Sequence, residues 1–303
     1  MGPSPRGHLL LASAHAGSAE DGAVAAARGV LAGAGPVEVI TTGTPDELDS
    51  ALDRLDGRTL VVAGGDGSLH LAVSRLHARD ALRETRLLRE IRMGLVPLGT
   101  GNDLARTLDL PLDPADAARL VLRAHSRPLD LLLDDAGGLV VNAVHLGVGA
   151  EAAAHAGRLK PRLGPAAYPI GAVAAGLKAT GWRLRVEVDG RVLTDNHRRT
   201  LMVGIGNGRG IGGGTQLLPQ AEPDDGLLDV IVSQACGPCA RVRYGAALQA
   251  GNHLRDRQTR AARGRTVTVT GEQVEVNADG ELGEGIQRRS WTVAPGAWSL
   301  LRP

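Results

Sequence analysis

The strongest constraint on the fold is an alternation of strand-like and helix-like segments over roughly the first 130 residues. Four apolar runs are typical of buried strands: 8–14, 37–42, 59–65 and 92–99. Segments with apolar residues at helical spacing lie between and after them: 21–34, 44–55, 68–80 and 114–125. Because strands that are separated by helices usually run parallel, the pattern predicts an α/β domain with a parallel sheet.

The second half of the chain has a different residue pattern, in which strand-like runs dominate. These runs are 128–134, 138–147, 183–190, 199–207, 227–233, 266–271, 273–281 and 290–295. Asp-Gly pairs at 189–190 and 279–280 stand between alternating runs, which indicates two-residue hairpins. Helical stretches are expected only near 163–179 and 240–250. We therefore predict an α/β domain over 1–128 and a mostly antiparallel β-rich domain over 129–303, whose last strand returns to the first domain.

Composition excludes several classes of protein. The chain has 303 residues, 43% of them hydrophobic and 22% charged, with a net charge of +1, which is typical of a soluble globular protein. Aromatic residues make up only 2%, so a stacking surface for nucleic acid is not expected. No window approaches the ~20 apolar residues of a membrane-spanning helix. The run after Arg6 is too short for a signal peptide, so we expect a cytoplasmic protein.

A glycine-rich turn follows the third predicted strand, where Gly64, Gly65, Asp66 and Gly67 precede a helical run. Glycines at the start of a helix allow a phosphate to approach the backbone closely, and the helix offers N–H groups to it. Ser68 can cap the helix or contact phosphate. A carboxylate at Asp66 would repel a bare phosphate but suits a nucleotide that carries Mg²⁺. A tight acidic turn explains the four residues equally well.

A second glycine turn follows the fourth predicted strand and favours the ligand-binding interpretation. Gly99 and Gly101 alternate with Thr100 and Asn102 before another helix begins. Two such turns at the carboxyl ends of parallel strands form the crevice where α/β sheets bind ligands. Neither turn is a Walker A loop, because no Gly-Lys-Ser or Gly-Lys-Thr follows.

The motifs GGDGS and PLGTGNDLAR together resemble those of the diacylglycerol kinase catalytic-domain family, which includes sphingosine kinases. RLGPAAYPIGAV (162–173), GNGRGIGGGTQLLPQAEPDDGLLDV (206–230) and DGE (279–281) match further family segments in the same order. The resemblance implies a nucleotide domain like that of NAD kinases and phosphofructokinases. It also implies a Mg²⁺-dependent kinase that transfers the γ-phosphoryl of ATP to diacylglycerol or a related lipid, giving phosphatidic acid.

The resemblance implies roles for individual residues. Glu281 would be the base that accepts the hydroxyl proton, with Asp279 supporting it. Asp66 is counted with them as a catalytic residue. The nucleotide would contact residues Thr41, Gly64, Gly65, Asp66, Gly67, Ser68, Leu69, His70, Gly99, Thr100 and Asn102. Asp225 would hold a structural Mg²⁺ together with the backbone carbonyls of Glu222 and Leu227. From spacing alone, the acidic loop around Asp225 is more simply a solvated turn.

The chain departs from the family pattern at two places. The loop after the first strand reads SAHAG where the family has Asn-Pro-x-Ser-Gly. His70 and Leu71 stand where the family favours Asn and Glu. These departures motivate one alternative, a catalytically silent nucleotide- or lipid-binding homologue. A second alternative is a kinase for a soluble substrate such as NAD, which shares GGDG but should lack the acidic loop and the DGE signature. The first should bind without turnover, and the second should phosphorylate NAD.

Two further features admit a functional and a simpler interpretation. Cys236-Gly-Pro-Cys239 has the spacing of a thioredoxin-like redox pair, although two reduced thiols at a strand-to-helix turn are the simpler interpretation. Seven arginines between 241 and 265 could face anionic lipid during turnover, or they could be solvated. The sequence gives no oligomeric state and is compatible with a homodimer.

Overall fold

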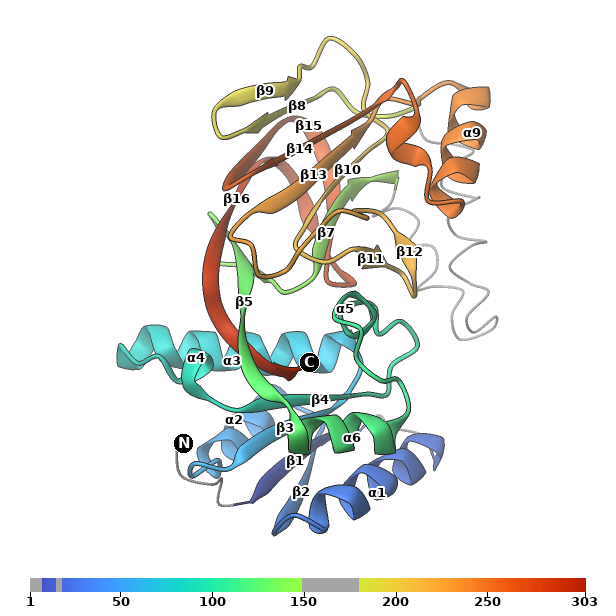
Figure 1. Ribbon diagram of the computed structural model, residues 1–303. Coiled ribbons are helices and arrows are strands. Elements are labelled where there is room, and N and C mark those ends of the chain that lie inside the picture. The colour runs from blue at the N-terminus through green and yellow to red at the C-terminus, as the bar shows by residue number, and fades with distance from the viewer. Residues whose placement is uncertain (1–6, 15–17, 149–179) are drawn as a thin grey trace. The chain divides into compact units, whose positions relative to one another are not determined.

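The computed structural model of the protein describes residues 7–14, 18–148 and 180–303. The chain forms two compact units (Figure 1). Unit 1 comprises Met1–Leu129 and Gly296–Pro303, and unit 2 comprises Asp130–Pro295. The last eight residues therefore belong to the same unit as the N-terminal part of the chain.

Unit 1 is built on a parallel sheet with the strand order β2-β1-β3-β4. The strands are β1 (His8–Ser13), β2 (Val37–Thr42), β3 (Thr59–Gly64) and β4 (Met93–Pro97). The helices are α1 (Ser18–Ala32), α2 (Pro45–Asp53), α3 (Asp66–Arg83), α4 (Leu87–Glu90), α5 (Asp103–Thr107) and α6 (Pro114–Arg123). This arrangement confirms the predicted parallel α/β fold.

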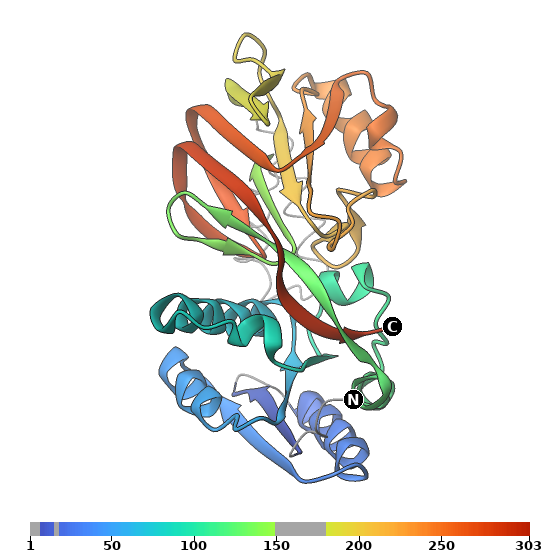
Figure 2. The same cartoon turned by 60° about the vertical axis from the view of Figure 1, so that its left-hand side comes forward.

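The helices of unit 1 cover both faces of the sheet because side chains alternate along each strand. Leu10 and Val61 face α1 and α6, and they share one core with Leu301 from the end of the chain. Helices α2 and α3 lie on the other side of the sheet (Figure 1, Figure 2). Thr44 and Glu47 start α2 with a reciprocal capping box, which explains why that helix begins where the sequence indicates.

Unit 2 contains a ten-stranded sheet with the order β14-β13-β10-β7-β15-β16-β5-β6, and β8 and β9 extend it from β15. Its first strands are β5 (His125–Asp134), β6 (Leu139–Val140), β7 (Ala143–Gly147), β8 (Leu184–Val188), β9 (Arg191–Thr194) and β10 (Met202–Gly206). They are followed by β13 (Leu228–Ser233), β14 (Thr259–Gly264), β15 (Thr266–Ala278) and β16 (Glu281–Arg302). The part of β16 from Gly296 onward belongs to unit 1. A small ribbon, β11 (Gly210–Ile211) with β12 (Thr215–Gln216), and two helices, α9 (Pro238–Gln249) and η2 (His253–Arg255), complete the unit.

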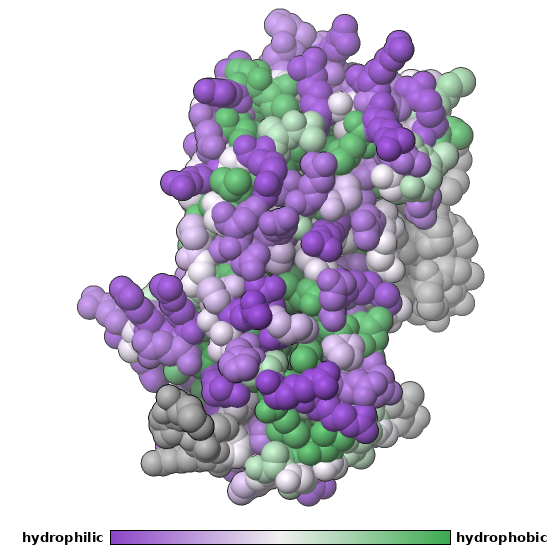
Figure 3. Space-filling view, in the orientation of Figure 1, coloured by the Kyte–Doolittle hydropathy of each residue, from purple (hydrophilic) through white to green (hydrophobic). Residues whose placement is uncertain are grey.

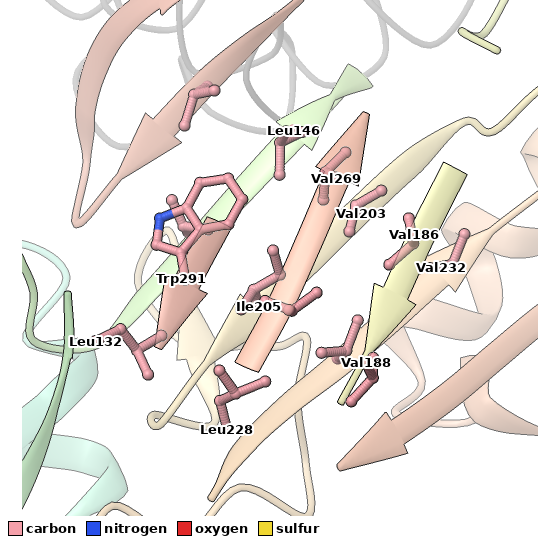
Figure 4. Packing of buried hydrophobic residues seen from close by; sticks show 14 of the residues in the cluster. Leu132, Leu146, Val186, Val188, Val203, Ile205, Leu228, Val232, Val269 and Trp291 are labelled. Atoms are coloured by element: carbon pink, nitrogen blue, oxygen red, sulfur yellow. The ribbon is translucent and has the colours of Figure 1, made fainter. Parts of the chain in front are cut away.

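Both predicted hairpins are present in unit 2. Asp189-Gly190 joins β8 to β9 and Asp279-Gly280 joins β15 to β16, and all four residues have positive φ. Positive φ at both turn positions matches the right-handed twist of the strands. Val203, Leu146 and Trp291 lie in the apolar core that the surrounding strands enclose (Figure 4). The antiparallel, β-rich character predicted for this half of the chain is confirmed.

The helical prediction is confirmed at 240–250, where the structure has α9. The predicted helix at 163–179 and the family segment at 162–173 lie outside the described residues. Among the described residues, three strands were not predicted: the short ribbon of β11 and β12, and β14, whose arginines the sequence placed in a helix or loop.

Polar side chains cover most of the face in view, with smaller apolar areas between them (Figure 3).

Candidate active site

The predicted nucleotide-binding residues of unit 1 gather at the carboxyl edge of the parallel sheet. Thr41 lies near the end of β2, Gly64 ends β3, and Gly99 follows β4. Since the strands are parallel, all three stand at the same edge. The Thr41 strand is separated from β3 by β1.

The two glycine turns touch each other. A Cβ atom on Gly99 would lie 2.6 Å from the Cα of Gly65, and one on Gly65 would lie 2.9 Å from the Cα of Gly99. A Cβ on Gly64 would lie 2.5 Å from the Ser68 hydroxyl oxygen. Such distances are too short for a side chain, so these positions are glycine for reasons of space. The close contact brings the turns after β3 and β4 into one surface.

Asp66 and Asn102 lock these turns by hydrogen bonds. The Asp66 carboxylate accepts the backbone N–H groups of Asp103 (3.1 Å) and Leu104 (3.2 Å), which begin α5. The Asn102 side chain accepts from the Gly99 N–H (2.9 Å) and donates to the Gly99 carbonyl (2.7 Å). Asn102 itself has a positive φ of 51°, a conformation that asparagine tolerates. Asp66 thus joins the start of α3 to the start of α5.

The remaining residues of the predicted nucleotide site differ in what they can offer. Thr100 is exposed, and Ser68 and His70 are partly exposed at the start of α3. Leu69 is buried in the core, and its N–H donates to the Gly65 carbonyl at 3.2 Å. Neither its side chain nor its amide is therefore available to a nucleotide, so Leu69 plays a structural part in this span.

The Asp279-Gly280 turn of unit 2 is anchored by one carboxylate. Asp279 accepts the N–H groups of Val141 (2.6 Å), Asn142 (2.9 Å) and Ala143 (3.0 Å), which lead into β7. Glu281 follows as the first residue of β16, and its side chain is exposed. The bonds from Asp279 hold the turn against β7, while Glu281 projects from it. This geometry suits an orienting role for Asp279 and a chemical role for Glu281.

The acidic loop is paired with an arginine. Arg263 forms ion pairs with Asp225 and with Asp229 (3.2 Å), and Asp225 also accepts the Leu227 N–H at 3.0 Å. Burial raises the pKa of Asp229, which Arg263 partly offsets. Among the residues that the structure describes, no three or more His, Cys, Asp or Glu side chains are gathered as metal ligands. A Mg²⁺ ion at Glu222, Asp225 and Leu227 would have to compete with Arg263, and that site stays a prediction.

Sequence reasoning missed Asp130. This residue is 2% exposed, accepts the Gly226 N–H at 2.7 Å, and donates its own N–H to the Pro223 carbonyl at 2.8 Å. It therefore holds the acidic loop from β5. An acidic residue inside the apolar run Leu129–Leu133 was the signal, because buried carboxylates need partners.

The cysteine pair and the arginine-rich stretch have structural partners. Cys236 and Cys239 are both free thiols, and Cys236 donates to the Arg199 carbonyl at 3.2 Å. Burial raises the pKa of Cys236, which disfavours a reactive thiolate. Arg243 pairs with Asp256 at 2.8 Å, and Arg263 holds the acidic loop. In the described part of the chain, no helix is long and apolar enough to cross a membrane.

Family models account for nearly the whole chain. Residues 8–133 match the diacylglycerol kinase catalytic domain, and residues 142–302 match the YegS C-terminal NAD kinase beta sandwich-like domain. The division between the two matches falls close to the division between the two compact units.

Individual relatives agree with these matches. The protein named "Probable lipid kinase YegS-like" from Pseudomonas aeruginosa strain UCBPP-PA14 is 37% identical over 252 residues, covering 81% of this chain and 76% of that protein. "Diacylglycerol kinase" from Staphylococcus carnosus is 26% identical, covering 75% and 71%. A solved chain from Bacillus anthracis str. Sterne has a TM-score of 0.76 at 20% identity, covering 98% of this chain and 97% of its own. At that identity the structural likeness concerns the fold.

Proposed function

Because the chain belongs to the diacylglycerol kinase catalytic-domain family and is a lipid kinase, we propose that it phosphorylates diacylglycerol. The γ-phosphoryl of ATP is transferred to the free hydroxyl of the lipid, giving phosphatidic acid and ADP. The oxygen–phosphorus bond to the lipid forms as the bond to the ADP oxygen breaks. The proton of the hydroxyl leaves to a protein base.

Unit 1 supplies the nucleotide site of this proposal. The backbone at Gly65 and Gly67 and the first turn of α3 offer N–H groups and the positive end of an 18-residue helix to the phosphates. Ser68 and Thr100 offer hydroxyl groups from the two touching turns. Thr41 would contact the nucleotide from β2. This arrangement fits a polyphosphate rather than an apolar ligand.

Mg²⁺ would enter with the nucleotide. Such an ion commonly uses one or two carboxylates together with substrate phosphates, so Asp66 is a sufficient protein donor at the edge of the glycine turns. When bound, the ion would neutralise charge on the transferred phosphoryl group. The hydrogen bonds from Asp103 and Leu104 fix the Asp66 carboxylate in place, and each oxygen retains a second lone pair.

Glu281 is the proposed base, and its position after an anchored turn is the observation that carries the proposal. The Asp279 carboxylate already accepts hydrogen bonds from three backbone N–H groups, so its proposed role is to position the turn. Glu281 is exposed and free to accept the hydroxyl proton. Kinases that act on alcohols need such a carboxylate because the rest of catalysis is positioning and charge stabilisation.

A labelled-ATP assay tests this function. The purified protein is incubated with Mg·ATP and, separately, with diacylglycerol, sphingosine, phosphatidylglycerol and NAD. We expect label in phosphatidic acid. Label in another lipid would support lipid kinase activity but contradict diacylglycerol as the acceptor. Label in NADP would favour the soluble-substrate alternative. Nucleotide binding without transfer to any acceptor would favour a silent homologue.

A further inference from the structure

Four polar side chains lie buried where three neighbouring strands of unit 2 end. Asn142 precedes β7, His145 lies within it, Asn207 follows β10, and Asn277 lies near the end of β15. Their exposed fractions are 7%, 3%, 1% and 1%, respectively. Polar side chains buried this deeply normally have hydrogen-bond partners.

Strand pairing brings the four residues together. Strands β10, β7 and β15 are neighbours in the sheet. Asn277 lies directly opposite His145, so the two side chains share one face of the sheet. The Asn207 N–H donates to the Asn142 carbonyl at 3.0 Å, which ties the end of β10 to the start of β7.

Several polar atoms of this cluster have no partner within the described residues. They are both side-chain atoms of the Asn207 amide, Nδ2 of Asn277, Nδ1 of His145 and Oδ1 of Asn142. The Asn142 oxygen packs against Gly208, where a Cβ would lie only 1.7 Å from it. The unpaired atoms of Asn207 and Asn277 are therefore the main evidence for a binding site. Unpaired buried groups are costly, so either a bound molecule or an internal water is expected to satisfy them.

The cluster adjoins the turn that presents Glu281. The Asn277 side chain accepts the Gly280 N–H at 3.1 Å, and the Asn142 N–H donates to Asp279 at 2.9 Å. Two of the four residues thus bond directly to the turn. A ligand held by their neighbours would lie on the same strand ends as the proposed base.

The chemistry of the cluster is uncharged. Three members are amides, and burial lowers the pKa of His145 to about 4, so its imidazole is neutral at neutral pH. Amides donate and accept hydrogen bonds at once, as hydroxyl groups do. An anionic phosphate would instead call for charge-assisted donors such as Arg or Lys. Hydroxyl and ester oxygens are the better match.

We propose that the side chains of Asn207 and Asn277, with Asn142 and His145 beside them, bind the uncharged glycerol head of the acceptor lipid and direct its hydroxyl toward Glu281. This inference rests on the proposed lipid kinase function and adds the residues that select the acceptor. It assigns to the cluster a positioning role, distinct from proton transfer.

The Asn207→Leu variant tests the proposal, because leucine keeps the approximate volume and removes both unpaired atoms. If the amide serves a ligand, its loss should leave the melting temperature unchanged or raised, since no internal hydrogen bond is broken. The KM for dioctanoylglycerol in mixed micelles should rise roughly tenfold, the scale of one hydrogen bond. The KM for ATP should stay unchanged. Asn277→Ala provides a second variant if Asn207→Leu fails to fold.

Thr200→Val is the matched control. Thr200 is also fully buried in unit 2 with an unpaired hydroxyl oxygen, but it lies in the bridge to Trp182. Loss of the Thr200 hydroxyl should leave the KM for dioctanoylglycerol and the KM for ATP unchanged. An Asn207→Leu enzyme with an unchanged KM for dioctanoylglycerol would overturn the proposal and point to internal water as the partner. A rise in KM for Thr200→Val of the same size would overturn it too.

Acceptor specificity separates this inference from the function on which it rests. Decanol offers a hydroxyl but no glycerol oxygens, so Asn207→Leu should lose far less activity with decanol than with dioctanoylglycerol. Equal losses would overturn the assignment. If the wild-type protein phosphorylates no lipid, the proposed function fails, and equilibrium binding of dioctanoylglycerol to wild type and Asn207→Leu decides the inference. Equal binding by both proteins would then overturn it.

Discussion

Asp279 shows how one carboxylate can determine the position of a whole turn. Its three backbone hydrogen bonds reach a segment about 140 residues earlier in the chain. Without that acceptor, the N–H groups before β7 would lose a charged partner, and the turn carrying Glu281 would lose its anchor. The roles proposed for Asp279 and Glu281 therefore differ because the Asp279 carboxylate is already bonded to the backbone, whereas the Glu281 side chain is exposed.

His145 predicts a pH dependence of stability. Burial lowers its pKa from 6.5 to about 4, so between these values the unfolded chain binds a proton that the folded chain does not. Stability is therefore lost as the pH falls through this window, by about 2 kcal/mol at about pH 5. His145→Leu should show a correspondingly smaller fall, measured by denaturant unfolding at neutral and acid pH. Identical pH profiles would contradict the buried neutral imidazole.

At the scale of elements, the site of unit 1 depends on two turns that only glycine allows to touch. Gly99→Ala would place a Cβ 2.6 Å from the Gly65 backbone, so one turn must move. We expect a loss of roughly 1–3 kcal/mol in the free energy of unfolding and weaker ATP binding.

Gly67→Ala is the control within the same motif. Nothing lies within 4 Å of its Cβ position, and alanine favours a helix, so stability should be equal or up to about 1 kcal/mol greater. Thermal unfolding and nucleotide titration compare the two variants. Equal stability of Gly99→Ala and wild type would show that the turns do not need their close contact.

The elements also show what could be predicted from sequence and why. Apolar periodicity and Asp-Gly turns identified the parallel sheet and both hairpins, because these features depend on local residues. The strand β14 was missed because Arg260 and Arg263 obscured its alternation, and Arg263 is explained only by its ion pairs with a distant loop. The partners of Asp66, Asp130 and Asp279 likewise depend on tertiary contacts that local patterns do not report. The assignment of Glu281 came from family resemblance, since an exposed hairpin glutamate has no local signature.

At the scale of the whole molecule, the C-terminal residues belong to the core of unit 1. Leu301 is 1% exposed and packs in the same cluster as Leu10 and Val61. Leu301→Ala should cost about 2–5 kcal/mol in the free energy of unfolding of that unit, because it leaves a cavity. Leu282→Ala, on the same strand but 49% exposed, should change stability by less than about 0.5 kcal/mol. Equal effects in denaturant unfolding would contradict this placement.

The protein is a lipid kinase with Glu281 as its proposed base, and the rate of lipid phosphorylation by Glu281→Gln tests this role most directly. Glutamine keeps the shape of the side chain but cannot accept the proton, so kcat should fall roughly 10²–10⁴-fold. Nucleotide affinity and thermal stability should stay at wild-type values. Glu284→Gln, which alters another exposed glutamate of β16, should retain full activity. A Glu281→Gln enzyme that phosphorylates its lipid at nearly the wild-type rate would contradict the account.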